Sequence, residues 1–340
     1  MPSPAGSPQR LIAGRPRTVA ALGQDEHVLH LRLVVPAVCS DEVSRLLVAD
    51  RRVTSVIRLH GAALDPPGDV VECDVAREAA SDVLGQVRAL GLDDEGTVTI
   101  QEIASAPSRR ARAAEDAAPG SPDDALVWDV VVERAYADAR DSWSFYAFLA
   151  LATAIAAIAV VLDSSVLVVG AMVVGPEFGA VTALATGLVL RQHRLVSGGA
   201  RLLVQGFAFA IAVTVLLGLA AGAAGWIDAA SLTAPRPSTG FIWKPDRWSF
   251  VVALLAGVAG TLSQTAGRSN ALVGVFISVT TVPAAGNLAL ALALWVPAEM
   301  GGSAAQLGVN LLGMVVAGVL TLLVQRAVWR RVRYHVHPLR

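Results

Sequence analysis

Long apolar runs fill the second half of the chain, in the pattern that membrane-crossing helices require. Crossing the hydrocarbon core, about 30 Å thick, takes roughly 20 mainly apolar residues in a helix. Six stretches approach or exceed this length: 143–162, 165–190, 202–226, 248–266, 271–296 and 304–324. We therefore expect a membrane domain of six helices over residues 143–325, with the lipid bilayer as its partner.

The first part of the chain has short segments of alternating or helix-periodic apolar residues, as a small soluble domain does. Residues 27–35 alternate apolar and polar positions as a half-buried strand does, and Ser40 with Asp41 opens an apolar-periodic helix. Three more strands are predicted at residues 53–59, 70–75 and 97–103. A second helix is predicted at residues 78–90, between the last two of these strands. The order βαββαβ predicts a ferredoxin-like α+β sandwich with two helices on one face of a four-stranded antiparallel sheet.

Composition divides the chain into segments. We expect a disordered N-terminus (1–26), the soluble ferredoxin-like domain (27–105), a flexible linker rich in Ala, Pro, Ser and Arg (106–124), a juxtamembrane amphipathic helix (125–142), the membrane domain (143–325) and a basic cytoplasmic tail (326–340).

The overall composition supports a membrane protein and disfavours several other classes. Hydrophobic residues make up 54% of the 340 and charged residues 16%, with a mean hydropathy of +0.57. The net charge of -1 gives no reason to expect nucleic acid. Cys39 and Cys73 lie in the soluble part without zinc-type spacing, so we expect thiols, no metal and no cofactor. The spans contain no HExxH, GxSxG or acid-rich cluster, and we do not expect an enzyme.

The charges between the apolar stretches predict the orientation. Arg191, Arg194 and Arg201 follow the second stretch, Arg268 follows the fourth, and several arginines follow the last. The positive-inside rule then places both termini in the cytoplasm of a multi-pass protein, which we expect in the plasma membrane. The third connection, 227–247, falls outside although it carries Arg236, Lys244 and Arg247, which runs against that rule.

Glycine and proline interrupt the second and fifth apolar stretches at matching positions. Pro176 is followed by Gly179, and Pro283 by Gly286. If stretches one to three repeat as four to six, the odd number of crossings inverts the second copy, as in transporters built from a 3+3 inverted repeat with broken helices. The alternative is two kinked helices that merely pack closely, since Gly and Pro are common in membrane helices.

One ionisable residue, Glu177, follows Pro176 near the middle of the second stretch. Such a residue costs about 2.5 to 3.5 kcal/mol at the centre of a membrane helix and usually has a function. The alternative is a protonated Glu177 bonded to backbone freed by the prolines, with the nearby hydroxyls acting as helix caps. We expect an ion- or substrate-binding site near the midplane, formed by Gly175, Pro176, Glu177, Gly179, Thr280, Thr281, Pro283 and Asn287.

Two other polar residues of the apolar stretches, Asn310 and Gln264, are explained by hydrogen bonding between helices without a function.

These residues resemble a known family. The segment DSSVLVVGAMVVGPEFGAVTALATGLV (163–189) is similar to the signature of the bacterial and archaeal membrane family called domain of unknown function 389. Residues 70–103 resemble the soluble region that precedes this domain in actinobacterial members, and the resemblance covers about residues 27–325. It implies an uncharacterised hydrophobic membrane domain without an established activity, so it carries over no catalytic residue.

We expect a membrane transporter or channel for an ion or small polar solute, regulated or assembled through its soluble domain. Gly218 and Gly222, four residues apart, would allow close helix packing, and we expect a homo-oligomer. The alternative is a non-transporting membrane sensor or scaffold that signals through the soluble domain. A dry, fully packed midplane would favour this alternative.

Overall fold

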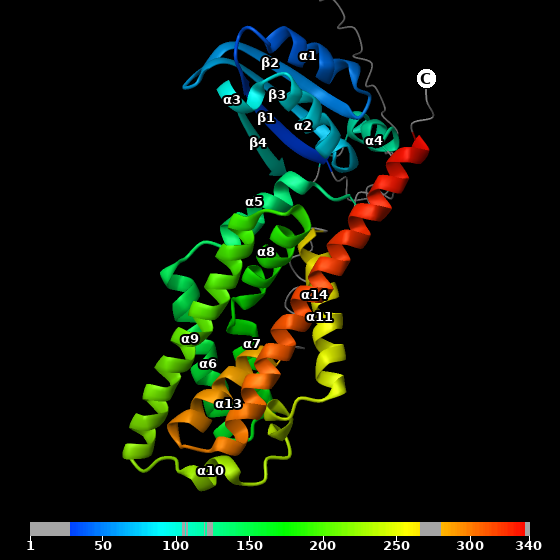
Figure 1. Ribbon diagram of the computed structural model, residues 1–340. Helices are drawn as coiled ribbons and strands as arrows, with labels where there is room; N and C mark the ends of the chain where they lie inside the picture. Colours follow the sequence, from blue (N-terminus) through cyan, green and yellow to red (C-terminus); the bar gives the residue numbers. More distant parts are fainter. Residues whose placement is uncertain are drawn as a thin grey trace, which may run out of the picture. The chain divides into compact units, whose positions relative to one another are not determined.

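The computed structural model describes residues 28–103, 106, 108–118, 120, 125–265 and 280–336, without the side chains of residues 93, 94 and 330–336. The chain forms two compact units, one containing the sheet and the other helices α5 to α14 (Figure 1). The predicted disordered N-terminus, Arg268 and the start of the predicted fifth span at 271–279 lie outside the described residues.

The N-terminal unit contains the predicted four-stranded antiparallel sheet. Its strands are β1 (Val28–Val35), β2 (Val53–Leu64), β3 (Pro67–Ala76) and β4 (Thr97–Glu102), in the spatial order β2-β3-β1-β4. The helical segments along this part of the chain are α1 (Ser40–Ala49), η2 (Arg77–Ala79), α2 (Ala80–Ala89) and α3 (Leu92–Glu95), of which residues 78–85 are grouped with the other unit. Strand β2 extends five residues beyond its predicted end and pairs with β3 as far as Leu64 opposite Pro67.

The alternation read from the sequence matches the burial of β1, one of the two inner strands of the sheet. Leu29, Leu31 and Leu33 are buried on one face while Arg32 is exposed on the other. In α1 the apolar positions Val43 and Leu47, four residues apart, are fully buried. Period 2 in the strand and period 3.6 in the helix therefore determine which faces form this core.

A further helix, α4 (Arg109–Asp116), lies within the segment predicted to be a flexible linker. The hydroxyl of Ser108 accepts a hydrogen bond from the backbone N–H of Ala111 and caps this helix. Helix α4 contacts β2 and β3 and buries Ala111 and Ala114. The Ser cap, followed by Arg and Ala residues that favour helix, was the sequence signal for it.

The helical unit contains long apolar helices at the positions of the predicted spans. Within the described residues, four are long and apolar enough to cross a membrane, or five if α7 and α8 count as one span bent by 53°. They are α6 (Trp143–Val161), α7 (Ser165–Val174) with α8 (Glu177–Leu190), α9 (His193–Ala223), α11 (Arg247–Thr265) and α14 (Pro297–Val336). A shorter apolar helix, α13 (Thr281–Ala293), lies in the predicted fifth span, and α5 (Trp128–Asp138) in the predicted juxtamembrane helix.

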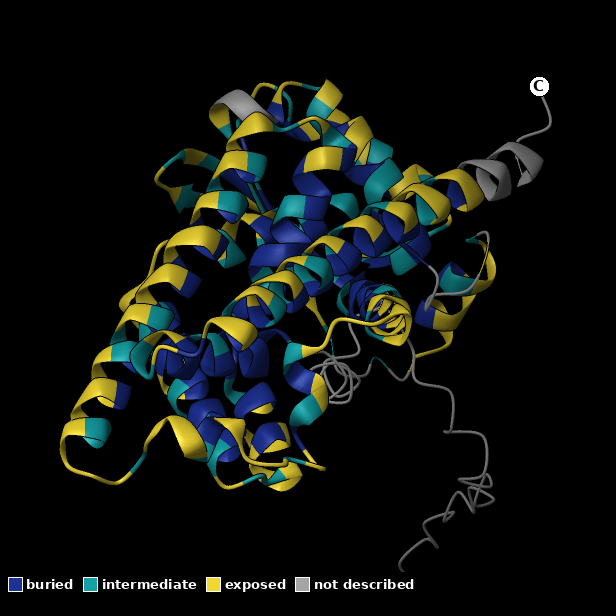
Figure 2. Ribbon diagram, turned by 60° about the horizontal axis from the view of Figure 1, so that its bottom comes forward, coloured by how far each residue is buried: buried dark blue, intermediate teal, exposed yellow. Residues whose placement is uncertain are grey.

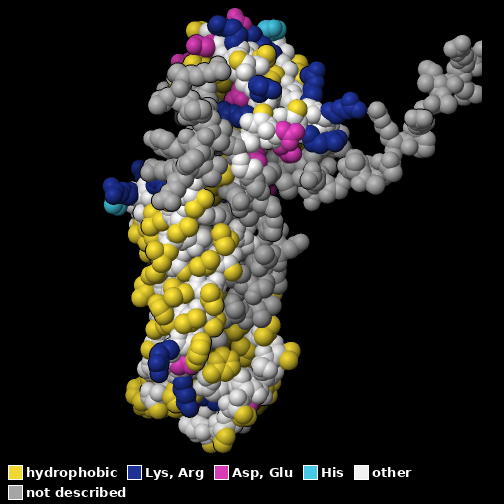
Figure 3. Space-filling view, turned by 90° about the vertical axis from the view of Figure 1, so that its right-hand side faces the viewer, with side chains coloured by type: hydrophobic (Ala, Val, Ile, Leu, Met, Phe, Trp, Pro, Cys, Tyr) yellow, Lys and Arg dark blue, Asp and Glu magenta, His cyan; other side chains and the backbone are white. Residues whose placement is uncertain are grey.

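Buried and exposed positions in this unit are distributed as in a protein that packs in lipid. Its buried core is rich in alanine and holds one cluster joining α6, α7, α8, α9, α11, α13 and α14 (Figure 2). Its surface carries exposed large apolar side chains such as Phe148, Ile158, Leu216 and Leu320. One face shows a band of hydrophobic side chains, with basic side chains toward its ends (Figure 3). Water would make such a surface costly, whereas lipid would not.

The connection between α9 and α11 is a folded segment, which we call the cap segment (residues 227–246). It contains α10 (Ala229–Thr233) and the short helix η4 (Gly240–Trp243). Leu232 and Ile242 are fully buried in a cluster with residues of α6, α7 and α13. Asp163 accepts hydrogen bonds from the backbone N–H of Ser238 and the hydroxyl of Thr239. The cap segment therefore packs on the ends of the helices.

Candidate functional site

The second predicted span is broken between α7 and α8, as its glycine and proline indicate. Pro176 is the N-cap of α8 and Gly175 before it has an extended conformation. Proline removes a backbone donor and disfavours the helical conformation in the preceding residue, so α7 ends at Val174. A Cβ on Gly175 would collide with the carboxylate of Glu177 and with Val282. The glycine thus leaves room for the side chain of Glu177.

The starts of α8 and α13 meet at this break. Glu177 is the first residue of α8 and Thr281 the first residue of α13, and the Thr281 hydroxyl donates to Glu177 Oε1 at 2.6 Å. Both side chains are buried. Helix N-termini carry a partial positive charge and favour anionic groups, so the two meeting termini favour a carboxylate between them.

The second carboxylate oxygen of Glu177 is left without a partner. Glu177 Oε2 is buried and accepts no hydrogen bond in the part of the chain that the structure describes. A buried polar atom without a hydrogen-bond partner costs about 1 to 3 kcal/mol of folding free energy, because it has lost its hydration. This loss is recovered if a proton, an ion or a solute donor binds there.

A row of buried polar side chains runs along one face of α14. Glu299, Ser303, Gln306 and Asn310 are separated by four, three and four residues, which aligns them on one side of a helix, and each residue as a whole is at most 4% exposed. The amides of Gln306 and Asn310 both donate to the hydroxyl of Thr280, at 3.1 and 2.9 Å. The row therefore extends from the start of α14 to the residue that precedes Thr281.

At the start of α14 the row joins a buried ion pair with the cap segment. Arg236 donates to Glu299 Oε1 at 2.5 Å and to Asn287 Oδ1 at 2.9 Å. The Asn287 amide donates in turn to Glu299 Oε2 at 2.9 Å and to the hydroxyl of Ser303 at 2.8 Å. Arg236, one of the three basic residues that ran against the predicted orientation, is thus buried and paired.

A cavity of about 220 Å³ lies between the cap segment and this row. Its lining includes Phe241 and Lys244 from the cap segment, Trp248 from α11, and Thr280 and Asn310 below. The Lys244 ammonium lies 4.8 Å from the ring centroid of Trp243. The cavity brings solvent-sized space to the hydroxyl and amide that end the polar row.

The structure brings only some of the eight predicted site residues together. Gly175, Pro176, Glu177, Thr280 and Thr281 lie at the break or directly beside it.

The other three predicted residues lie elsewhere. Asn287 belongs to the cluster with Arg236. Pro283 is buried in the first turn of α13. Gly179 packs against Asp138 of α5, whose Cγ would be 3.0 Å from an added Cβ. Gly179 is thus a packing position between helices.

Sequence reasoning missed or set aside the residues of α14 and the cap segment. Asn310 was assigned to hydrogen bonding between helices, and it does bond to Thr280 of α13. The spacing of Glu299, Ser303 and Gln306 was the signal that could have revealed the row. The role of Arg236 had no local signal, because its partners are 51 and 63 residues away.

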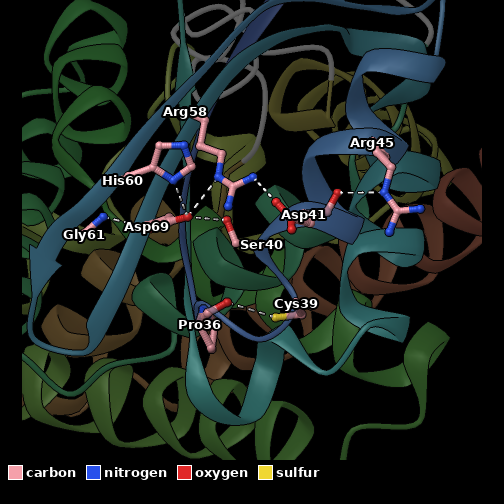
Figure 4. Close-up of polar contacts among 9 residues, drawn as sticks. All are labelled: Pro36, Cys39, Ser40, Asp41, Arg45, Arg58, His60, Gly61 and Asp69. Carbon is pink, nitrogen blue, oxygen red and sulfur yellow. Dashed lines mark hydrogen bonds and ion pairs between the residues drawn. The ribbon is translucent and has the colours of Figure 1, made fainter.

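A separate charged cluster in the N-terminal unit surrounds Asp69 (Figure 4). Its carboxylate accepts from the hydroxyl of Ser40 at 2.6 Å, the N–H of Gly61 at 2.8 Å and the guanidinium of Arg58 at 2.9 Å. The Ser40 hydroxyl and the Gly61 amide hold the pKa of Asp69 well below its usual range. With both oxygens satisfied, Asp69 joins α1, β2 and β3, which is a structural role.

The apolar helices of membrane-spanning length indicate a membrane-embedded α-helical protein with a small antiparallel sheet at its N-terminus. Residues 172–316 match the family model described as domain of unknown function (DUF389). This match supports the predicted resemblance to that family over this segment.

A relative is known among curated proteins. An uncharacterised protein of the archaeon Methanocaldococcus jannaschii is 27% identical over 135 residues. The match spans 40% of this chain and 39% of that protein. No solved structure matches the chain significantly.

Proposed function

We propose that this protein moves an ion or a small polar solute across the membrane through its helical unit, without a catalytic step. The observation that carries the proposal is the buried Glu177 carboxylate, held by Thr281 between two helix starts and with one oxygen unpartnered among the described residues. Transporters place discontinuous helices of this kind at their binding sites.

The polar row of α14 supports the same proposal. A helix that only anchors a protein in lipid has no need of four buried polar side chains, since each must find a partner or lose hydration. Hydroxyl, amide and carboxylate groups in a row can replace the water of a passing solute. In this proposal the row connects the cap segment to Glu177.

Several features of the whole protein complete the proposal. They are six spans with a 3+3 inverted repeat, both termini in the cytoplasm, a plasma-membrane location, assembly as a homo-oligomer and a regulatory or assembly role for the N-terminal unit. The meeting of α8 and α13 at their first residues supports the repeat, because two copies related by an axis in the membrane plane would juxtapose corresponding helix starts.

The test is solute flux in proteoliposomes that contain the purified full chain. Monovalent ions, divalent ions, small organic anions and small organic cations are tested as tracers, together with a pH-sensitive dye inside the vesicles. The variant Glu177→Gln keeps the shape of the side chain and removes its charge. Glu133→Gln is the matched control, because Glu133 is an exposed residue of α5.

We expect Glu177→Gln to lower the flux of the transported species at least about tenfold, the order that follows from losing a charged hydrogen-bonding group worth about 1.5 kcal/mol or more. Glu133→Gln should leave it unchanged. Equal flux in the wild type and Glu177→Gln would contradict the proposed site. A correctly inserted wild type that passes none of the tracers would favour the sensor or scaffold alternative.

A further inference from the structure

Arg236 is a buried cation that the cap segment inserts into the helical unit. Its side chain and that of Glu299 are each 5% exposed. Its two terminal nitrogens donate to different acceptors, Glu299 on α14 and Asn287 on α13. A planar guanidinium with donors in a fixed fork suits such a pair of acceptors better than a compact ammonium does.

The groups that receive Arg236 form a cation site without it. Glu299 supplies a carboxylate, and Asn287 supplies its carbonyl oxygen while its amide is held by Glu299 and Ser303. These three residues come from α13 and α14, so the site does not depend on the backbone of the cap segment. With Arg236 withdrawn, the Glu299 charge would be buried without a cation, which is costly.

This site adjoins the rest of the polar row. Gln306 lies one turn beyond Ser303 on α14, is 1% exposed, and its Oε1 has no hydrogen-bond partner among the described residues. A solute leaving the Glu299 site therefore meets an unoccupied buried acceptor next. The acceptors after it, Thr280 and Glu177, also present oxygen atoms.

The cap segment has enough other contacts to stay in place when Arg236 leaves. Leu232 and Ile242 are fully buried. Asp163 accepts hydrogen bonds from Ser238 and Thr239, which follow Arg236 closely in the sequence. Withdrawal of one side chain requires only new rotamers. The exchange of Arg236 for another cation is therefore a local event.

We propose that Glu299, Asn287 and Ser303 form a cation-binding site at the cap end of the polar row, and that Arg236 is its tethered occupant. The solute that displaces Arg236 is a cation with N–H donors, of the guanidinium or alkylammonium type. This inference rests on the proposed transport function and names its substrate class.

The first experiment measures binding to the vacated site by thermal unfolding of the full chain in detergent. The variant Arg236→Ala is titrated with methylguanidinium, and with methylurea as a neutral probe of similar shape. We expect a saturable rise in melting temperature with methylguanidinium alone, since a ligand that binds only the folded state stabilises it. Wild type, in which the ligand must displace Arg236, should need a clearly higher concentration for the same rise.

The double variant Arg236→Ala with Glu299→Gln is the control for nonspecific effects of methylguanidinium. It lacks the carboxylate and should show no rise. If Arg236→Ala shows no saturable rise, or if the double variant shows the same one, the cation site is refuted.

The second experiment measures flux with Arg236→Lys. This variant keeps the positive charge, so the cap segment should fold even if Arg236→Ala does not. A lysine ammonium cannot reproduce both guanidinium contacts. We expect labelled methylguanidinium to enter proteoliposomes about tenfold faster than with wild type, because the lysine would hold the site with one charge-assisted hydrogen bond fewer than Arg236 does. Methylurea flux should stay unchanged. Unchanged methylguanidinium flux, or an equal rise for both probes, would overturn the role of Arg236.

The two proposals fail in different ways. If Arg236→Ala binds methylguanidinium but Glu177→Gln alters no flux, the cation site stands and the transport site at Glu177 does not. If Glu177→Gln abolishes flux and no variant binds methylguanidinium, transport stands and the tethered-cation inference is refuted.

Discussion

Replacement of Gly286 by alanine tests the contact between α13 and α6. A Cβ at this position would lie 2.8 Å from the backbone nitrogen of Ala157 and 2.9 Å from both the Cβ of Ala156 and the backbone oxygen of Thr153. Ordinary contacts of this kind begin at 3.4 Å. Because these atoms are backbone or Cβ atoms, no side chain can rotate away, and the two helices must move apart by about half an ångström in a close-packed interior.

The expected loss of stability follows from two opposing effects. Overpacking of a well-packed interior costs about 1 to 3 kcal/mol. Alanine regains up to about 1 kcal/mol over glycine through its higher helix propensity. We therefore expect Gly286→Ala to destabilise the full chain by about 1 to 2 kcal/mol. Gly170→Ala in α7 is the control, because nothing lies within 4 Å of its added Cβ, and it should be neutral or slightly stabilising.

The assay is unfolding of both variants in detergent micelles, followed by tryptophan fluorescence against denaturant concentration. A Gly286→Ala protein as stable as wild type, in the same series in which Gly170→Ala behaves as expected, would refute the close approach of α13 to α6. A free energy of unfolding that is lower for Gly286→Val than for Gly286→Ala, and lower for Gly286→Ala than for wild type, would further support this close approach.

Three more predictions concern both units. The lowered pKa of Asp69 contributes stability that is present above about pH 4, near its ordinary pKa, and is lost as the pH falls through the folded value. Asp69→Asn should therefore increase hydrogen exchange in β3 at pH 7 and increase it less at lower pH, whereas an equal increase at all pH values would contradict this. Burial raises the pKa of the Cys73 thiol to about 12, so iodoacetamide at neutral pH should label the partly exposed Cys39 and leave Cys73 unmodified until the sheet unfolds. Labelling of both thiols in the folded protein would contradict the burial of Cys73. A Cβ on Gly302 would collide with the backbone oxygen of Trp243, so Gly302→Ala should increase hydrogen exchange in η4 and leave exchange in the N-terminal sheet unchanged. Unaltered exchange in η4 would contradict the close contact between the cap segment and α14.

The sequence alone determined the class of the protein and the positions of most elements. Apolar length identifies helices such as α6 and α11 nearly to the residue, because the bilayer requires a long uninterrupted apolar run. Alternation identifies β1 for a similar reason, since one face of a sheet is buried. The break before α8 was also predictable, because proline limits the backbone wherever it occurs.

Only the tertiary structure decided which polar residues meet. The Thr281 and Glu177 side chains are 104 residues apart in sequence, and Arg236 reaches Glu299 across 63 residues. Their proximity depends on how α13 packs against its neighbours and on the fold of the cap segment, and local patterns carry no information about either. The sequence therefore identified Glu177 as a costly residue, whereas the packed helices determined that its partner is the first residue of a second helix.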